Sequence, residues 1–135
     1  MQCRFSTRPE LSPSTSIRVS AQGFSRLTEG FAIVVNAAFA ADCRDHIVRE
    51  LGGEAELSVG DDLALLALQG PRSAAVLETL CPPVAALRFM QAGRFTIDGA
   101  GCLVSRSGYT GEDGFEISLP AGAACALAER LLASP

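Results

Sequence analysis

Residues 105–117 form the densest group of side chains that could bind a ligand. The segment reads Ser-Arg-Ser-Gly-Tyr-Thr-Gly-Glu-Asp-Gly-Phe-Glu-Ile, so it combines three glycines, three carboxylates, one arginine and the only tyrosine of the chain. Glycines permit positive φ angles and close backbone approach, so such a loop can wrap against a ligand. Strands on either side would hold Tyr109 and Glu116 in fixed directions, which suits molecular recognition.

A plain hairpin is the alternative interpretation of the same residues. Asp113-Gly114 is a common turn pair, Glu116 would face solvent between buried Phe115 and Ile117, and Tyr109 would belong to the core. The spacing alone fits both interpretations. A phosphate-binding loop fits poorly, because acids stand where such a loop needs a lysine.

The elements that must position this segment follow from hydrophobic periodicity and from turn residues. The pattern predicts an α+β fold in which helices pack on a mainly antiparallel sheet. Expected strands cover residues 33–35, 63–68, 94–97, 102–106 and 115–119, with residues 63–68 forming a buried strand. Three helices are expected. The first ends at residue 51 and has Cys43, Ile47 and Leu51 on its inner face, and the second begins at Pro71 and has Val76, Leu77 and Leu80 on its inner face. The third covers residues 123–132 and has Leu127 and Leu131 on its inner face.

Composition narrows the classes of function. The chain is 48% hydrophobic and 19% charged, which is typical of a folded globular protein. All its basic residues are arginine and its formal charge is -4, so nucleic acid is not an expected partner. The lack of lysine argues against P-loop and Schiff-base chemistry. No apolar run is long enough for a membrane span, so no membrane partner is expected.

The five cysteines lack the paired spacing of a zinc site, so we expect reduced thiols and no metal.

The first 28 residues differ from the rest. They are rich in serine and arginine and show no sustained periodicity, so we expect a poorly ordered or divergent leader at residues 1–28 and a domain at residues 29–135. A mitochondrial transit peptide is an alternative for the leader, but the apolar residues form no clear amphipathic helix.

Residues 105–117 closely resemble the signature of glycine cleavage system T proteins, the folate-binding aminomethyltransferases. Two further blocks, residues 65–71 (Leu-Leu-Ala-Leu-Gln-Gly-Pro) and residues 33–38 (Ile-Val-Val-Asn-Ala-Ala), are similar to other blocks of this family and occur in the family's order. The resemblance covers residues from about 24 to 132. It implies the folate-binding domain of that family, present in part.

The resemblance implies a tetrahydrofolate site and a lipoylated H protein as partner. In the family, the folate accepts a methylene group from the aminomethyl-lipoyl arm of H protein and ammonia is released. The matching positions assign folate binding to Asn36, Tyr109 and Glu116. A carboxylate at Glu116 can accept the adjacent N–H groups of a pterin, Tyr109 offers a ring and a hydroxyl, and the Asn36 amide both donates and accepts. On sequence alone, Asn36 equally fits a turn former at the end of a strand.

The resemblance breaks where the family carries its catalytic aspartate. Residues 11–28 contain no acid, so no catalytic residue is assigned, and Glu112 or Asp113 is not expected to substitute. Because positioned acid/base catalysis contributes about a hundred- to ten-thousandfold in rate, we expect a fragment with weak or no activity alone.

A non-enzymatic folate-binding module is one alternative, and a folate domain related to sarcosine- and dimethylglycine-demethylating enzymes is another. The expected compartment is the cytoplasm, or the mitochondrial matrix in a eukaryote.

Overall fold

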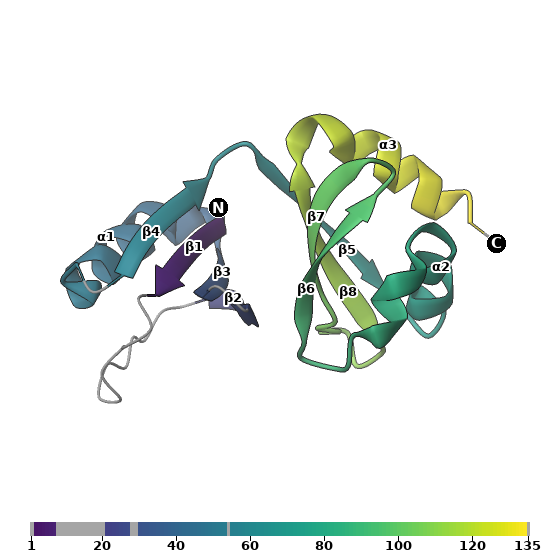
Figure 1. The fold of residues 1–135 in the computed structure, drawn as a ribbon, viewed down its shortest axis with the longest axis horizontal. Coiled ribbons are helices and arrows are strands. Elements are labelled where there is room, and N and C mark those ends of the chain that lie inside the picture. The colour runs from purple at the N-terminus through teal and green to yellow at the C-terminus, as the bar shows by residue number, and fades with distance from the viewer. Residues whose placement is uncertain (1, 8–20, 28–29, 54, 135) are drawn as a thin grey trace. The chain divides into compact units, whose positions relative to one another are not determined.

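The computed structural model describes residues 2–7, 21–27, 30–53 and 55–134. The chain forms two compact units, residues 1–61 and residues 62–135 (Figure 1). Each unit contains a four-stranded sheet, and the paired strands in both sheets run antiparallel. The expected α+β class with mainly antiparallel pairing is therefore confirmed, with the strands divided between two sheets.

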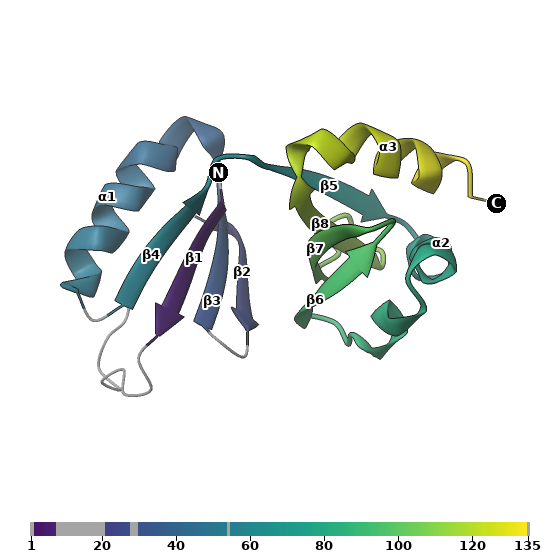
Figure 2. The same ribbon diagram turned by 45° about the horizontal axis from the view of Figure 1, so that its top comes forward.

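The first unit is a sheet with one helix packed against it. Its strand order is β2-β3-β1-β4. The strands are β1 (Gln2–Thr7), β2 (Ala21–Leu27), β3 (Gly30–Val35) and β4 (Ala55–Gly60). A 3-10 turn (Ala37–Phe39) leads into α1 (Ala40–Leu51), which lies beside the sheet in Figure 2. Cys43, Ile47 and Leu51 are buried against strand residues such as Ile33, which confirms the predicted inner face of this helix.

Strands β1 and β2 lie in the segment that was expected to be a poorly ordered leader. Serine and arginine give these strands no clear alternation, so the sequence pattern did not predict them. β1 pairs with both β3 and β4, and β2 pairs with β3, so the backbone hydrogen bonds of neighbouring strands stabilise them in place of a hydrophobic pattern. The boundary between the two compact units falls between Asp61 and Asp62, and the expected division between residues 28 and 29 stays a prediction.

The second unit contains the loop with the candidate site. Its strand order is β5-β8-β7-β6. The strands are β5 (Leu63–Gln69), β6 (Ala92–Ile97), β7 (Ala100–Ser105) and β8 (Gly114–Pro120), and the helices are α2 (Ser73–Leu80), a 3-10 helix (Pro82–Ala86) and α3 (Ala121–Leu132). All the elements predicted between residues 63 and 132 are present, with shifts of a few residues at their ends.

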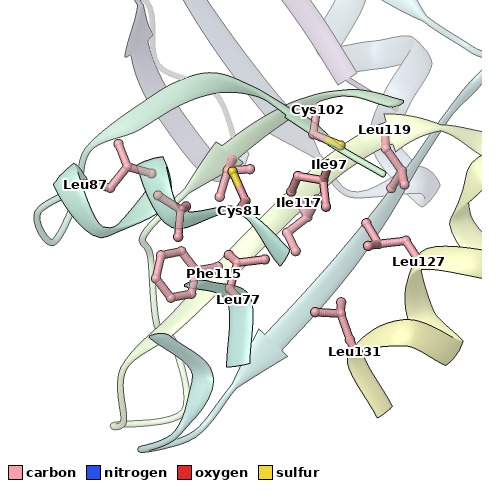
Figure 3. Packing of buried hydrophobic residues seen from close by; sticks show 12 residues of the cluster. Leu77, Cys81, Leu87, Ile97, Cys102, Phe115, Ile117, Leu119, Leu127 and Leu131 are labelled. Carbon is pink, nitrogen blue, oxygen red and sulfur yellow. The ribbon is translucent and has the colours of Figure 1, made fainter. Parts of the chain in front are cut away.

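The core of the second unit lies between the helices and one face of its sheet. Phe115, Ile117 and Leu119 project from β8 on the same side and are essentially inaccessible to solvent. They belong to one cluster with Leu77 of α2 and Leu127 of α3 (Figure 3). Because side chains alternate along a strand, this burial turns the intervening residues of β8 toward the opposite face of the sheet.

That opposite face, called the uncovered face below, is less buried than the core face, although Leu103 and Ser118 on it are buried. Strand β5 shows this most clearly, because Leu66 and Leu68 pack against the core whereas Leu65 is 38% exposed and Ala67 is exposed. The prediction that residues 63–68 form a buried strand was therefore wrong in this respect, because one face of the strand is exposed. A run of apolar residues does not reveal by itself whether both faces of a strand are covered.

The β6–β7 connection is the tight hairpin that Asp98-Gly99 predicted. Both residues have positive φ angles, 49° and 79°, as a two-residue turn of type I′ requires.

The difference between the two faces can be measured by truncating one leucine on each. Leu127→Ala should lower the free energy of unfolding by about 2–5 kcal/mol, because it leaves a cavity in the core. Leu65→Ala, the same chemical change on the uncovered face, should cost less than about 1.5 kcal/mol. Urea denaturation monitored by circular dichroism measures both, and equal losses would contradict the assignment of the faces.

Candidate functional site

The candidate site is built on the loop of residues 106–113, which joins β7 to β8. The two strands are paired where the loop begins and ends, with Ser105 opposite Glu116. Glu116 is also opposite Ala67 of β5, so its strand is paired on both sides. The loop therefore begins directly after a residue that pairs with β8, and it ends at Gly114 and Phe115, which pair with β5 alone.

Arg106 and Asp113 close the base of this loop with a two-pronged ion pair. Nε of Arg106 donates to Oδ1 of Asp113 at 2.9 Å, and Nη2 donates to Oδ2 at 2.5 Å. Such planar, bidentate pairs are among the strongest charge-assisted hydrogen bonds. The hydrogen bonds from Arg106 hold the pKa of Asp113 below its ordinary value.

The Arg106 side chain also binds outside the loop. Its Nη1 donates to the carbonyl oxygen of Leu87 at 2.9 Å, and its guanidinium carbon lies 5.3 Å from the centre of the Phe115 ring. The sequence alone assigns Arg106 no role. In the structure it joins three segments: the start of the loop, the end of the loop and the chain that follows the 3-10 helix.

Gln69, the last residue of β5, ties the loop to the neighbouring strand. Its Oε1 accepts a hydrogen bond from the backbone N–H of Tyr109 at 3.3 Å. The backbone N–H of Gly70 donates to the carbonyl oxygen of Asp113 at 2.9 Å. The loop is thus held at its base by an ion pair and along its length by the end of β5.

Gly108 and Gly114 in the loop segment must be glycine, because other atoms occupy the space that a Cβ atom would need. A Cβ atom on Gly108 would lie 2.1 Å from the carbonyl oxygen of Glu112, and one on Gly114 would lie 2.1 Å from Oε1 of Gln69. Both distances are far below any real contact. These glycines therefore allow the loop to fold tightly on itself and against Gln69.

Tyr109 is on the surface. It is 67% exposed, so the alternative that placed it in the core is wrong. Its backbone is held by Gln69, while its ring is available to a ligand.

Glu116 lies on the uncovered face of the sheet, between buried Phe115 and Ile117, and is half-buried. Its Oε2 accepts a hydrogen bond from the hydroxyl of Ser107 at 3.1 Å, and the hydroxyls of Ser105 and Ser107 lie 2.8 Å apart. The carboxylate is therefore more than a solvated strand residue, because it belongs to a hydrogen-bonded chain of side chains.

Asn36 lies in the other unit, at the start of the 3-10 turn. Its Oδ1 accepts a hydrogen bond from the backbone N–H of Ala38 at 3.0 Å, so it acts as the turn former that its position after a strand favours. Because it belongs to residues 1–61, its meeting with Tyr109 and Glu116 at one site stays a prediction.

Sequence reasoning did not single out Gln69, Ser105 or Ser107. Gln69 is part of one block of the resemblance, and Ser105 and Ser107 stand two residues apart, the spacing of neighbours on one face of an extended chain. Two hydroxyl side chains at this spacing, facing a glutamate on the expected neighbouring strand, are the sequence signal that could have identified Ser105 and Ser107.

Some classes of site and partner can be checked directly in the described part of the chain. There, no cluster of three or more histidine, cysteine, aspartate or glutamate residues could hold a metal ion, and no helix is long and apolar enough to cross a membrane. Cys43, Cys81, Cys102 and Cys125 are free thiols.

Comparison with known proteins places these features in a family. A model of the GCVT N-terminal domain matches residues 24–135. The probable mitochondrial aminomethyltransferase of Schizosaccharomyces pombe is 43% identical over 109 residues, which cover 76% of this chain and 28% of the relative. The mitochondrial aminomethyltransferase of Gallus gallus is 48% identical over 90 residues, which cover 65% of this chain and 23% of the relative. The chain thus spans about a quarter of the length of these curated relatives.

A solved structure agrees with the sequence comparisons. The crystal structure of the glycine cleavage system aminomethyltransferase T from Bartonella henselae superposes with a TM-score of 0.74 at 34% sequence identity. The match covers 98% of this chain and 43% of that chain.

The ion pair of Arg106 and Asp113 predicts a dependence of stability on pH. Asp113→Asn should lower the free energy of unfolding by about 1 kcal/mol at neutral pH, because it removes a charge-assisted pair that is partly exposed to solvent. The lowered pKa of Asp113 means that this contribution is present above the ordinary aspartate value of about 3.9 and is lost as pH falls through the folded-state value. The gap between wild type and variant should therefore narrow in acid.

Denaturant titrations of both proteins between pH 7 and pH 3 measure this gap. Asp98→Asn is the matched control, since Asp98 makes a more exposed ion pair with Arg130 at 3.3 Å. A gap for Asp113→Asn that stays constant with pH would show that the ion pair does not stabilise the fold.

Gly114→Ala should release the loop without unfolding the unit. The new Cβ must displace the Gln69 side chain, which then loses its hydrogen bond to the Tyr109 backbone. Tyr109 is the only tyrosine and the chain has no tryptophan, so the anisotropy of its fluorescence reports the mobility of the loop and should fall. Gly122→Ala, where a Cβ meets no atom within 4 Å, is the control and should leave the anisotropy unchanged. Equal anisotropy in the two variants would argue against the role of Gln69.

Proposed function

The chain belongs to the GCVT N-terminal domain family, and from this membership we propose that its β7–β8 loop and the uncovered face of its second sheet bind tetrahydrofolate. The proposed activity of the longer protein is aminomethyl transfer in the glycine cleavage system. N5 and N10 of tetrahydrofolate each form a bond to the methylene carbon of the aminomethyl group on the lipoyl arm of H protein. The bond from that carbon to nitrogen breaks to release ammonia, the bond to the lipoyl sulfur breaks to leave the dihydrolipoyl thiol, and methylenetetrahydrofolate forms. Tetrahydrofolate is the co-substrate and lipoylated H protein is the partner.

The observation that supports the folate site best is the setting of Glu116. Its carboxylate lies on the uncovered face of the sheet, half-buried, and is held by Ser107. A pterin ring presents adjacent N–H donors, and a carboxylate is the side chain that can accept them with a charge-assisted bond. The exposed ring of Tyr109 belongs to the loop that leads into the same strand, and it offers an aromatic face and a hydroxyl.

Asn36 is the third proposed ligand of the folate. Its Oδ1 accepts from Ala38, and its amide nitrogen is the group that would donate to the pterin. This assignment depends on the family resemblance of residues 33–38.

The missing aspartate favours binding over turnover in this chain. Residues 11–28 contain no acid, and this is where the resemblance places the catalytic aspartate. Asp113 does not replace it, because both of its carboxylate oxygens accept hydrogen bonds from Arg106. We therefore propose weak or no turnover by the chain on its own, and a folate-binding module without enzymatic activity is the second candidate function.

The compartment is the cytoplasm or the mitochondrial matrix. Several relatives are mitochondrial by name, which supports the second of these for a eukaryotic chain.

Glu116→Gln tests the folate site. The substitution keeps the size of the side chain but replaces an acceptor oxygen with a donor, so tetrahydrofolate should bind about tenfold more weakly or worse. Glu129→Gln, the same change at an exposed position of α3, is the control and should leave the affinity unchanged. Calorimetric titration measures the dissociation constants, and circular dichroism checks that both variants are folded.

Two results would count against the proposal. Unchanged affinity in a folded Glu116→Gln variant would remove the carboxylate from the site, and no binding to the wild-type chain would remove the site itself. Ammonia release from aminomethylated H protein, measured beside binding, distinguishes the two candidate functions, because binding without turnover supports the non-enzymatic module.

A further inference from the structure

Three side chains on the uncovered face of the second sheet form one hydrogen-bonded chain. Ser105 ends β7 and is paired with Glu116 of β8 across the sheet. Ser107 follows two residues later, at the start of the loop. Its hydroxyl lies 2.8 Å from that of Ser105 and 3.1 Å from Oε2 of Glu116. All three residues are half-buried, so their hydrogen bonds are partly shielded from competing water.

The donor and acceptor groups of the three side chains fix the direction of each hydrogen bond between them. An ionised carboxylate only accepts, so the single hydroxyl hydrogen of Ser107 is donated to Glu116. The contact between the two serines must then use the hydroxyl hydrogen of Ser105, with Ser107 as acceptor. Ser105 thus donates to Ser107 and Ser107 donates to Glu116, and hydrogen bonds in series of this kind polarise and strengthen one another.

We propose that Ser107 is a positioning residue for ligand binding: it holds Oε2 of Glu116 and thereby presents Oε1 to the N–H groups of the bound pterin. This inference rests on the proposed folate site. A glutamate side chain has several freely rotating bonds, and ordering it on binding costs conformational entropy. A carboxylate that is already oriented avoids that cost, which is the usual benefit of a preorganised site.

The location of Ser107 also couples the carboxylate to the loop. Ser107 stands directly after Arg106, whose ion pair with Asp113 closes the base of the loop. The same short segment therefore fixes the loop through its arginine and the carboxylate through its serine. Tyr109 and Glu116 thus depend on neighbouring anchors, Gln69 for the first and Ser107 for the second.

The test is a double-mutant cycle on the full 135-residue chain, with tetrahydrofolate as the probe in calorimetric titrations. Ser107→Ala should weaken binding about fivefold, the effect of losing one hydrogen bond to the acceptor. Ser107→Thr keeps the hydroxyl and should restore the affinity to within about twofold of the wild type. Ser105→Ala, the same chemical change one step away from the carboxylate, should weaken binding less than Ser107→Ala does.

The decisive measurement is Ser107→Ala in a Glu116→Ala background, because alanine leaves no oxygen that could accept from Ser107. A residue that acts through Glu116 loses its effect there, so the double variant should bind no more weakly than Glu116→Ala alone. A fivefold loss that persists in this background would mean that Ser107 contacts the ligand or merely supports the fold, and would overturn the inference.

The outcomes also separate this inference from the proposed function. Weaker binding in Glu116→Gln together with unchanged binding in Ser107→Ala would overturn the positioning role and leave the folate site standing. Unchanged binding in Glu116→Gln would overturn both. Thermal unfolding of each variant checks that affinity is compared between folded proteins, and the threonine variant keeps the test valid if Ser107→Ala fails to fold.

Discussion

The geometry of the candidate site depends on the ion pair that Arg106 and Asp113 form across the base of the loop. A loop rich in glycine has many conformations available to it, and ordering it is costly. Here one guanidinium group binds both carboxylate oxygens of Asp113 and the carbonyl oxygen of Leu87, and it lies over the ring of Phe115. The Arg106 side chain thereby joins the two ends of the loop to each other and to the core, so the positions of both ends are fixed.

The sheet supplies the second constraint, because it decides which side chains can reach a ligand. Phe115 and Ile117 face the helices, and this burial places Glu116 on the opposite face. Tyr109 is positioned differently, since its backbone is held by Gln69 while its ring stays exposed. The Glu116 carboxylate therefore comes from a strand that is paired on both sides, whereas the Tyr109 phenol comes from a loop that Gln69 holds in place.

Much of the second unit could be predicted from the sequence, because its signals are local. Leu127 follows helical periodicity, and Asp98-Gly99 marks a tight turn. Strands β1 and β2 could not be predicted, because their stability comes from pairing with distant strands. The exposure of one face of β5 depends on what packs above it, which an apolar run does not encode.

Tertiary contacts at the candidate site could not be predicted from the sequence either. Glu116 and Tyr109 were identified by type and by family resemblance, whereas the contacts that orient them, through Ser107 and Gln69, are tertiary and became visible only in three dimensions. Asn36 was also assigned by resemblance, and its contact in the structure is a local one with Ala38.

The alternation of β8 also restricts how this site can evolve. A shift of its pairing by one residue would carry Glu116 beneath the helices and expose Phe115 and Ile117, so slippage would destroy the core together with the site. Selection for a stable protein thus preserves the orientation of position 116 whatever side chain stands there. The strand and its apolar residues would be kept, and only the identity of that one side chain would be free to change.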